Sequence, residues 1–233
     1  MTDVLYVLAD KENRGSDREL RLSLRSLQKN CKDLGRVFIC TDELPDWIQN
    51  VEHIKCGDSW NGYPENNVYD KVYEAVLNMK CRNFLFMNDD FYMMKPFYAK
   101  EYPYYYRGSL GYIENPSRWQ EVNNKTIDLL KDRRAYLFLD YGVHCPILYN
   151  RTTLKSLCKF FDDKRHGHCG VHLRSLYGNL LYGISGERVD DCKLWHGEPL
   201  RESQTGCIST ADGADDVLDE IEKIFNRKCK YEK

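Results

Sequence analysis

The segment that most constrains this chain is a short apolar run that ends in two adjacent carboxylates. Residues 84–87 are Phe-Leu-Phe-Met, and Asn88, Asp89 and Asp90 follow directly. A continuous apolar run of this length is typical of a strand buried on both faces, as in a parallel sheet covered by helices. Carboxylates at the end of such a strand must reach a crevice, because burying them unpaired is costly. In open α/β sheets, ligands bind in the crevice beyond the carboxyl ends of the strands.

Asp89 and Asp90 are therefore candidate metal ligands. Mg²⁺ and Mn²⁺ prefer oxygen ligands, and proteins often hold them through one or two carboxylates together with substrate phosphates. Adjacent strand residues point to opposite faces, so both carboxylates reach one ion only if the backbone has already turned. We favour Asp90 over Asp89 as the direct ligand. The alternative is a strand end that carries two solvated acids.

The first hundred residues alternate between strand patterns and helix patterns. The expected strands cover residues 4–8, 37–40, 51–55 and 84–87, and the helices between them carry apolar residues at positions 20, 24 and 27 and at 68, 72, 76 and 79. Strand–helix–strand units of this kind build parallel sheets. The sequence therefore predicts an α/β fold, a mostly parallel, Rossmann-like sheet flanked by helices.

The pattern loosens after residue 100. A capping box at Ser117 opens a helix, and a strand carrying His144 is expected within residues 142–149. Further helices are expected within residues 153–161 and 171–182 and after Asp212, which would cap the last one, whereas residues 184–210 show no clear period. Without repeats or linkers, residues 1–233 are predicted to form one domain. Residues 1–100 would form a nucleotide-binding half, and residues 101–233 would form the acceptor side.

Composition and charge narrow the function classes. Hydrophobic residues make up 42% of the chain and charged residues 30%, which is ordinary for a globular protein. A net charge of −2 provides no global positive field for nucleic acid, although a basic cluster between residues 151 and 174 leaves a local patch. The apolar run at residues 4–9 is too short for a signal segment or a membrane span. We therefore expect a cytoplasmic protein, with no membrane partner, whose ten cysteines are reduced thiols.

Two arginines on the first helix are candidate nucleotide-binding residues. Arg21 and Arg25 are one turn apart and share a helix face. Their forked guanidinium groups suit phosphate oxygens. The alternative is a surface helix on which they pair with Glu19.

Three further residues are candidates for contacts with the nucleotide. Asp70 and Lys71 are predicted near the start of the helix before the acidic strand. A lysine at a helix start is disfavoured by the helix dipole, so an anionic partner would explain it; an ordinary exposed lysine is the alternative. Asp10 lies in the polar loop after the first strand and is counted with them.

Four sequence blocks occur in the order found in a known protein family. They are DRELRLSLRSL at 17–27, VFICTD at 37–42 with PDW at 45–47, FLFMNDD at 84–90, and HCP at 144–146. The series resembles the Stealth family of sugar-phosphate transferases, and also small phage and bacterial glycosyltransferase-like proteins with the GT-A nucleotide-sugar fold. The resemblance covers roughly residues 3–180. The first two blocks and the Asn-Asp-Asp block together are fairly specific.

The resemblance implies a nucleotide-sugar donor, Mn²⁺ or Mg²⁺, and transfer to an acceptor hydroxyl. The acceptor would be a glycan, a metabolite or a modified DNA base, in the cytoplasm of a bacterium or of a phage-infected host cell. Many GT-A enzymes carry an Asp-x-Asp pattern, which is met here by Asn88, Asp89 and Asp90. Stealth-type sequences also carry Asn at the first position. Asn88 would then contact the metal, the nucleotide or only backbone.

The same resemblance singles out candidate catalytic residues. His144 matches the His-x-Pro block of Stealth sequences, and a histidine can remove a proton from an acceptor hydroxyl near neutral pH. Asp140 is an alternative base or an orienting partner for His144. Arg174 matches a late basic position and would offer bidentate contacts to a phosphate. The alternatives are a packing role for His144 and pairing of Arg174 with Glu187 or Asp190.

Several reaction classes remain open from the sequence. Attack at the anomeric carbon would transfer the sugar and release a nucleoside diphosphate, whereas attack at the β-phosphorus would transfer sugar-1-phosphate and release a monophosphate. A binding module for carbohydrate or nucleic acid, without turnover, is the non-enzyme alternative. A zinc site is a further alternative; its ligands would come from His166, His168, Cys169, His172, Cys192 and His196.

Overall fold

The central element of the fold is a five-stranded sheet with strand order β3-β2-β1-β4-β7. The computed structural model describes residues 1–12, 17–60, 63–165, 170–181 and 186–233. The strands are β1 (Thr2–Val7), β2 (Leu34–Thr41), β3 (Glu52–Lys55), β4 (Asn83–Met87) and β7 (Ile147–Asn150). The first four are parallel to one another, and β7 is antiparallel to β4. The predicted α/β class, with a mostly parallel sheet, is confirmed.

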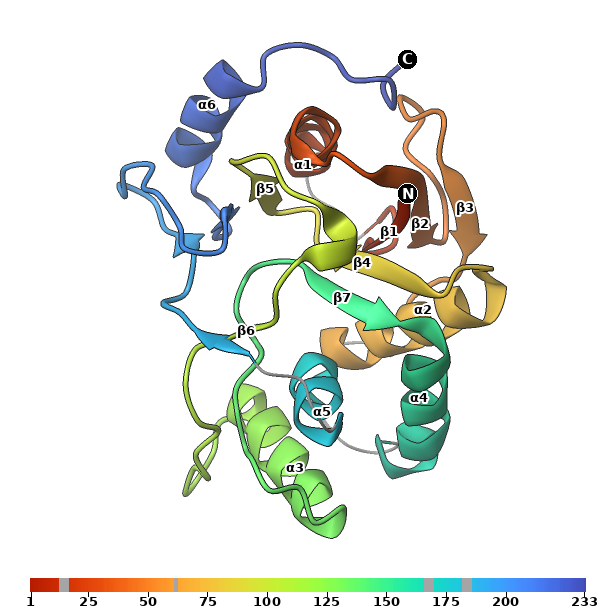
Figure 1. Ribbon diagram of the computed structural model, residues 1–233, viewed down its shortest axis with the longest axis vertical. Coiled ribbons are helices and arrows are strands. Elements are labelled where there is room, and N and C mark those ends of the chain that lie inside the picture. The colour runs from red at the N-terminus through yellow and green to blue at the C-terminus, as the bar shows by residue number, and fades with distance from the viewer. Residues whose placement is uncertain (13–16, 61–62, 166–169, 182–185) are drawn as a thin grey trace.

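Helices cover both faces of this sheet (Figure 1). Helix α1 lies on one face with α6 beside it, while α2, α4 and α5 lie on the other and α3 packs against α5. The described helices are α1 (Arg18–Asn30), α2 (Pro64–Asn78), α3 (Arg118–Asp132), α4 (Arg151–Arg165), α5 (Leu173–Leu180) and α6 (Asp215–Ile224). In the described part of the chain, no helix is both long and apolar enough to cross a membrane.

Two small sheets extend the fold beyond the central one. One has the order β5-β10-β9, and the other pairs β6 with β8. Their strands are β5 (Phe91–Met93), β10 (Cys207–Thr210), β9 (Lys193–Leu194), β6 (Tyr105–Tyr106) and β8 (Glu187–Arg188), and a short 3₁₀ helix, η1, covers Ala99–Glu101. Because β5 follows the acidic turn directly, its pairing with β10 brings a segment from the last third of the chain beside that turn.

Strand β4 is buried on both faces, as the apolar run predicts. Phe84, Leu85, Phe86 and Met87 are each at most 4% exposed. Phe84 and Phe86 pack into the core beneath α2 and α4. Leu85 and Met87 pack on the opposite face, against α1. Burying such side chains contributes roughly 1.5–3 kcal/mol each, so the strand that carries the acidic turn is firmly anchored.

A polar stripe on helix α1 holds the strand that follows the acidic turn. Ser23 Oγ donates to the Phe91 carbonyl (2.6 Å), and Ser26 Oγ accepts from the Met93 amide (2.9 Å). Asn30 Nδ2 donates to the Met93 carbonyl (2.6 Å). Strand β5 is therefore tied to α1 through its backbone, which fixes the chain on the far side of the carboxylates.

The structure differs from the sequence-based expectations in the later part of the chain. His144 precedes a strand instead of lying on one, because β7 begins at Ile147. The last helix begins at Asp215, so Asp212 precedes it without capping it. Lys71 lies in the interior of α2, which begins several residues earlier than predicted. The short strands within residues 184–210 were not predicted, since elements of two to four residues carry no periodicity.

The central sheet and the β5-β10-β9 sheet each draw strands from the two sides of residue 100. Strand β7 completes the central sheet, and β5 belongs to the small sheet with β9 and β10. The chain is thus a single α/β domain. A functional division into a nucleotide half and an acceptor half stays a prediction.

Candidate active site

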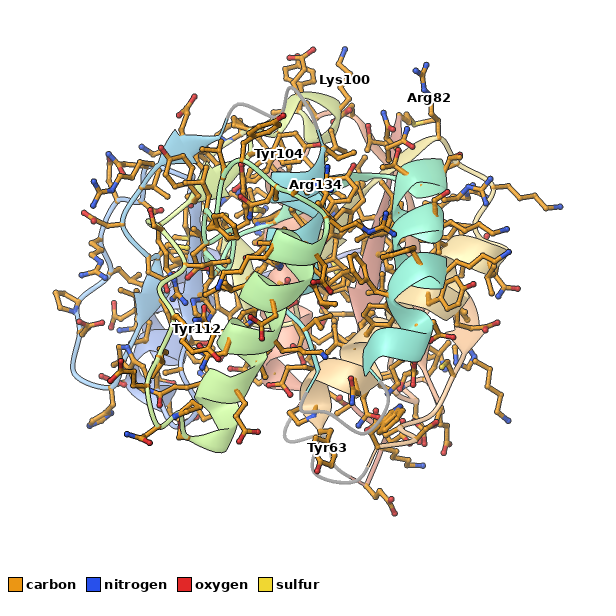
Figure 2. The ribbon with its side chains drawn as sticks, turned by 90° about the horizontal axis from the view of Figure 1, so that it is seen from below. Tyr63, Arg82, Lys100, Tyr104, Tyr112 and Arg134 are labelled. Atoms are coloured by element: carbon orange, nitrogen blue, oxygen red, sulfur yellow. The ribbon has the colours of Figure 1, made fainter. Side chains whose placement is uncertain are left out.

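Asn88, Asp89 and Asp90 form a tight turn at the carboxyl edge of the central sheet. The Phe91 amide donates to the Asn88 carbonyl (3.3 Å) and closes this turn. Because the backbone turns here, the two adjacent carboxylates are able to serve one site. Figure 2 shows Tyr63, which precedes α2 at this edge, and Arg82, which precedes β4, at opposite ends of the molecule.

A third carboxylate, that of Glu19 at the start of α1, lies near the two carboxylates of the turn. Burial first, and then the negative charges of Asp90 and Glu19, raise the pKa of Asp89 to about 7. Burial also raises the pKa of Glu19, although the Thr210 hydroxyl donates to Glu19 Oε1 (3.0 Å). This edge therefore holds more negative charge than its surroundings neutralise.

Asp90 has stabilising neighbours that do not cancel this charge. Burial raises the pKa of Asp90, while the Ser209 hydroxyl, which donates to Oδ2 at 2.6 Å, and the nearby charge of Lys193 act in the other direction. Among the described residues, neither Asp89, Asp90 nor Glu19 forms a salt bridge. Buried carboxylates with no counter-ion favour protonation or a bound cation.

The donor set fits a hard divalent cation that is completed by a substrate. No three His, Cys, Asp or Glu side chains lie close enough together to hold a metal ion in the described ranges, which omit residues 13–16, 61–62, 166–169 and 182–185. The chain thus offers carboxylate oxygens from Asp89 and Asp90, and further ligands must come from phosphate oxygens and water. Magnesium sites of nucleotide enzymes are commonly built in this way.

His144 is held by a carboxylate that the sequence did not reveal. Its Nδ1 lies 2.8 Å from Asp191 Oδ2 and 2.9 Å from Oδ1, and its backbone amide donates to Oδ1 (3.1 Å). Burial alone would raise the pKa of Asp191, but these hydrogen bonds and the positive charges nearby hold it well below its usual range. An ionised carboxylate only accepts, so Nδ1 carries the proton. Nε2 forms no hydrogen bond to the described chain and is left for a ligand.

Asp140 does not contact His144 directly. Its Oδ2 accepts from Arg107 Nε (2.6 Å), and its Oδ1 accepts from the Gly142 amide (2.8 Å). Arg107 Nη1 also reaches Asp191 Oδ2 (3.2 Å). The orienting partner of His144 is therefore Asp191, and Asp140 is linked to it only through Arg107.

Arg174 supports the segment that carries His144. Its Nη1 donates to the carbonyls of Val143 (2.8 Å) and Cys145 (2.7 Å), the two neighbours of His144. Its Nη2 is buried and has no hydrogen-bond partner in the described chain. Neither of the carboxylates considered from the sequence pairs with it.

A cavity of about 250 Å³ adjoins this segment, between α2, α5 and the end of β4. Its polar lining includes Asn88, His172 and Arg174, and most of the remaining lining is apolar. Burial lowers the pKa of His172, so this side chain is neutral near pH 7. Asn88 thus faces the cavity, whereas the two carboxylates after it lie near α1 and β10.

A second polar cluster at the same sheet edge joins two of the nucleotide-binding candidates, Lys71 and Asp10. Lys71 Nζ donates to Asp58 Oδ1 (2.6 Å), to Asp10 Oδ1 (2.9 Å) and to the Leu8 carbonyl (2.8 Å). Lys71 is 1% exposed. Its anionic partners are therefore carboxylates of the protein itself, and its three donors are all used. Asp70 accepts from Trp60 Nε1 (2.7 Å).

The two arginines of α1 bind a buried acid instead of projecting toward the carboxylate turn. Arg25 Nε and Nη2 donate to the two oxygens of Glu232 (2.7 and 2.8 Å), and Arg21 Nη1 reaches the same carboxylate (3.3 Å). Arg21 also stacks on Trp47. The structure thus gives both guanidinium groups a partner near the C-terminus, and neither pairs with Glu19.

Half of the ligands of the zinc alternative fall outside the described residues. His166, His168 and Cys169 belong to the undescribed segment. Of the other proposed ligands, the Cys192 thiol donates to the His144 carbonyl and His196 Nδ1 lies 3.0 Å from Asp216.

Sequence reasoning missed several residues of this site: Glu19, Arg107, Asp191, Lys193, Ser209 and Thr210. The sequence interpretation gave Glu19, which follows the motif's Asp-Arg pair, a capping role at the helix start and a pairing role with arginines, but no place at the carboxylates. The others come from segments without helix or strand periodicity, and only the tertiary fold brings them to the turn.

Comparison with known proteins supports the fold and no closer relationship. No family model matches the chain, and no curated protein sequence matches it. An active-site mutant of LgtC is similar in structure, with a TM-score of 0.52 and 10% identity over 98% of both chains. The galactosyltransferase LgtC in complex with donor and acceptor sugar analogues gives 0.49 over the same shares, at 10% identity. GlyE, a glycosyltransferase of Streptococcus pneumoniae TIGR4, gives 0.44 at 10% identity over 80% of this chain and 45% of that one. The chain therefore has the α/β fold of the GT-A glycosyltransferases.

Proposed function

We propose that this protein is a metal-dependent glycosyltransferase that moves a sugar from a nucleotide-sugar to an acceptor hydroxyl. The observation that carries the proposal is the buried, uncompensated carboxylate group of Asp89, Asp90 and Glu19 at the carboxyl edge of a GT-A sheet. A cation would relieve the repulsion in this group, and a nucleotide diphosphate would complete the coordination of the cation. The acceptor would be a glycan, a metabolite or a modified DNA base.

In this proposal Asp89 and Asp90 hold Mn²⁺ or Mg²⁺. The bound ion would offset the negative charge that develops on the departing nucleotide. Asp90 is the better candidate for direct contact, because the Ser209 hydroxyl fixes one of its oxygens. Asn88 faces the adjoining cavity, where it can donate to, or accept from, the sugar or the nucleotide.

His144 is the proposed general base for the acceptor hydroxyl. Asp191 holds the proton on Nδ1, so the Nε2 lone pair is the one that can accept a proton. The arrangement of carboxylate, imidazole and open nitrogen is the one that orients catalytic histidines generally. Asp140 is the weaker candidate, because Arg107 and the Gly142 amide already occupy its oxygens.

The nucleotide-binding candidates divide into two groups. Asp10 and Asp70 remain proposals for contacts through their carboxylates. Arg21, Arg25 and Lys71 have donors committed to the protein's own carboxylates, and a phosphate would have to displace these.

Transfer of sugar-1-phosphate, the Stealth reaction, is the second candidate function. The observation that favours it is the convergence of two Stealth-like positions: Arg174 grips the carbonyls on both sides of His144. A guanidinium group beside the proposed base suits a phosphoryl group that is being transferred. Product analysis separates the reactions, since sugar transfer releases a nucleoside diphosphate and sugar-phosphate transfer releases a monophosphate.

The direct test is a thermal-shift panel of nucleotide-sugars with and without Mn²⁺. A ligand that binds only the native state raises the melting temperature by mass action, and the right donor should do so only when metal is present. A panel in which no donor produces a metal-dependent shift would contradict the proposal.

Asp90→Ala separates an enzyme from a binding module that lacks turnover. We expect turnover to fall by about 10²–10³-fold, while the melting temperature of the free protein stays the same or rises because a buried like charge is removed. Asp128→Ala, on the exposed face of α3, is the matched control. If the native protein turned over no donor and Asp90→Ala still bound its ligand, the carbohydrate- or nucleic-acid-binding alternative would be favoured.

A further inference from the structure

We propose that Arg107 is a positioning residue that ties Asp191 to Asp140 and thereby fixes the ring of His144 with Nε2 open. The role of His144 as a base rests on the proposed function, whereas the tie itself does not. Arg107 follows β6 and lies far in sequence from both carboxylates.

The hydrogen bonds form a continuous chain from Asp140 to the imidazole. Arg107 Nε donates to Asp140 Oδ2 (2.6 Å), and Arg107 Nη1 donates to Asp191 Oδ2 (3.2 Å). The same Oδ2 lies 2.8 Å from His144 Nδ1. One guanidinium group thus joins two carboxylates, and one of these holds the histidine.

Backbone bonds make the Asp140 end of this chain rigid. The Arg107 amide donates to the Asp140 carbonyl (3.0 Å), and the Asp140 amide donates to the Gly108 carbonyl (2.8 Å). Asp140 Oδ1 also accepts from the Gly142 amide (2.8 Å). Asp140 is therefore held in place, and Arg107, bound to it, reaches Asp191.

Asp191 itself lies outside regular secondary structure, so side-chain contacts orient its carboxylate. It lies between the two-residue strands β8 and β9. Held by Arg107 on one side and His144 on the other, its carboxylate has one orientation. A planar fork suits two carboxylates at once, whereas a lysine is a single point charge and can satisfy only one of them well.

Several charged groups surround His144. Asp191 contacts its ring, Asp90 lies near it across the site, and Arg174 binds its flanking carbonyls. Arg107 contacts the Asp191 carboxylate that holds the His144 ring. His172 lies near Asp140 and Arg107 but is neutral.

The experiment is proton NMR of the ligand-free protein with labelled histidine. A proton on His144 Nδ1 that is held by a fixed carboxylate exchanges slowly and gives a sharp low-field resonance. We expect Arg107→Gln to broaden or remove this resonance, Arg107→Lys to keep part of it, and Asp140→Asn, which leaves the Arg107–Asp191 contact, to keep most of it. Turnover should fall about 10-fold to 100-fold in Arg107→Gln, the range for removing a residue that orients a functional side chain, with donor-induced thermal shifts unchanged.

Arg36→Gln is the matched control. Arg36 donates to Asp3 through its backbone amide (2.9 Å) and through Nη2 (2.7 Å), and its side chain is 51% exposed against 44% for Arg107. The control should leave the resonance unchanged.

A sharp resonance in Arg107→Gln, or equal broadening in Arg36→Gln, overturns the proposal. Because the resonance is read without substrate, it separates this inference from the transferase assignment. Loss of the resonance in a protein that shows no turnover with any donor would support the tie and refute the enzyme. Abolished turnover in Asp140→Asn with an intact resonance would instead make Asp140 the base.

Discussion

Two groups of partly buried carboxylates lie at the same edge of the central sheet, and only one of them is neutralised within the described chain. In the first, Lys71 joins Asp10 and Asp58, whose carboxylates also accept from each other's backbone amides (2.8 and 3.1 Å). In the second, Asp89 and Asp90 face a further acid with no salt bridge among the described residues.

The difference separates structural charge from functional charge. Burial alone would lower the pKa of Lys71, but hydrogen bonds and the charges of the two carboxylates raise it, so the ammonium stays charged. At the acidic turn the same burial raises the pKa of Asp89, because no cation of the described residues contacts it. A paired buried charge stabilises the sheet edge, and an unpaired one is a cost that a ligand can relieve.

The largest expected effect on stability comes from removing the cation of the neutralised group. Lys71→Met should destabilise the fold by about 3–5 kcal/mol, because it leaves Asp10 and Asp58 buried without a counter-ion. Urea unfolding measures this difference. Lys95→Ala, which removes an exposed pair with Glu202 (3.0 Å), is the control and should change stability by less than about 1 kcal/mol.

Equal effects of these two substitutions would show that the comparison is wrong and that Lys71 is not a structural cation. If Lys71→Met destabilised the protein only in the presence of donor, Lys71 would instead belong to the nucleotide site.

The next effect concerns the dependence of stability on pH. The pKa of Asp89 lies at about 7 in the native state, above its ordinary value of 3.8. Between these two values the native protein keeps a proton that the unfolded chain has released, so stability falls as pH rises from about 4 to about 7 and is then constant. Asp89→Asn removes this loss and should be more stable than the native sequence above pH 7, by up to about 4 kcal/mol, and about equal near pH 4.

Urea unfolding at several pH values from 4.5 to 8 measures the difference between the two curves. Parallel curves would mean that Asp89 ionises without cost, so that a partner already compensates its charge. Saturating Mn²⁺ with donor should reduce the difference, since a bound cation stabilises the ionised native form.

The smallest effect tests the one hydrogen bond that Asp90 receives from a side chain. Ser209→Ala removes a donor at 2.6 Å and should raise the pKa of Asp90 further, with a loss of about 1 kcal/mol in stability at neutral pH. The acid limb of the pH–rate profile should move to higher pH, because ionised Asp90 is needed to hold the metal. An unchanged profile would exclude Asp90 ionisation as the controlling step.

The amino-terminal half of the fold was predictable because its elements are long and periodic. The apolar run before Asp89 and Asp90 specified a doubly buried strand, and the leucines of α1 specified its buried face. Their positions at a sheet edge then followed from the topology of parallel sheets.

The partners of the site residues were not predictable for a different reason. Helical spacing shows that Arg21 and Arg25 share a face, but it does not show that their acid, Glu232, comes from more than 200 residues away. Likewise, Asp191 follows a two-residue strand and Ser209 lies on a four-residue strand. Elements this short leave no periodic signal, so only their packing reveals which of their side chains meet the acidic turn.

Helix α1 lies beside the acidic turn and also holds the strand that follows it. It contributes Glu19 at its first turn, and Ser23, Ser26 and Asn30 grip the backbone of β5 behind Asp90. Substitutions in this one helix would therefore be under selection for stability and for activity at the same time. A lineage that changes its buried polar stripe can be expected to change the acidic turn with it, so the two should evolve as a single unit.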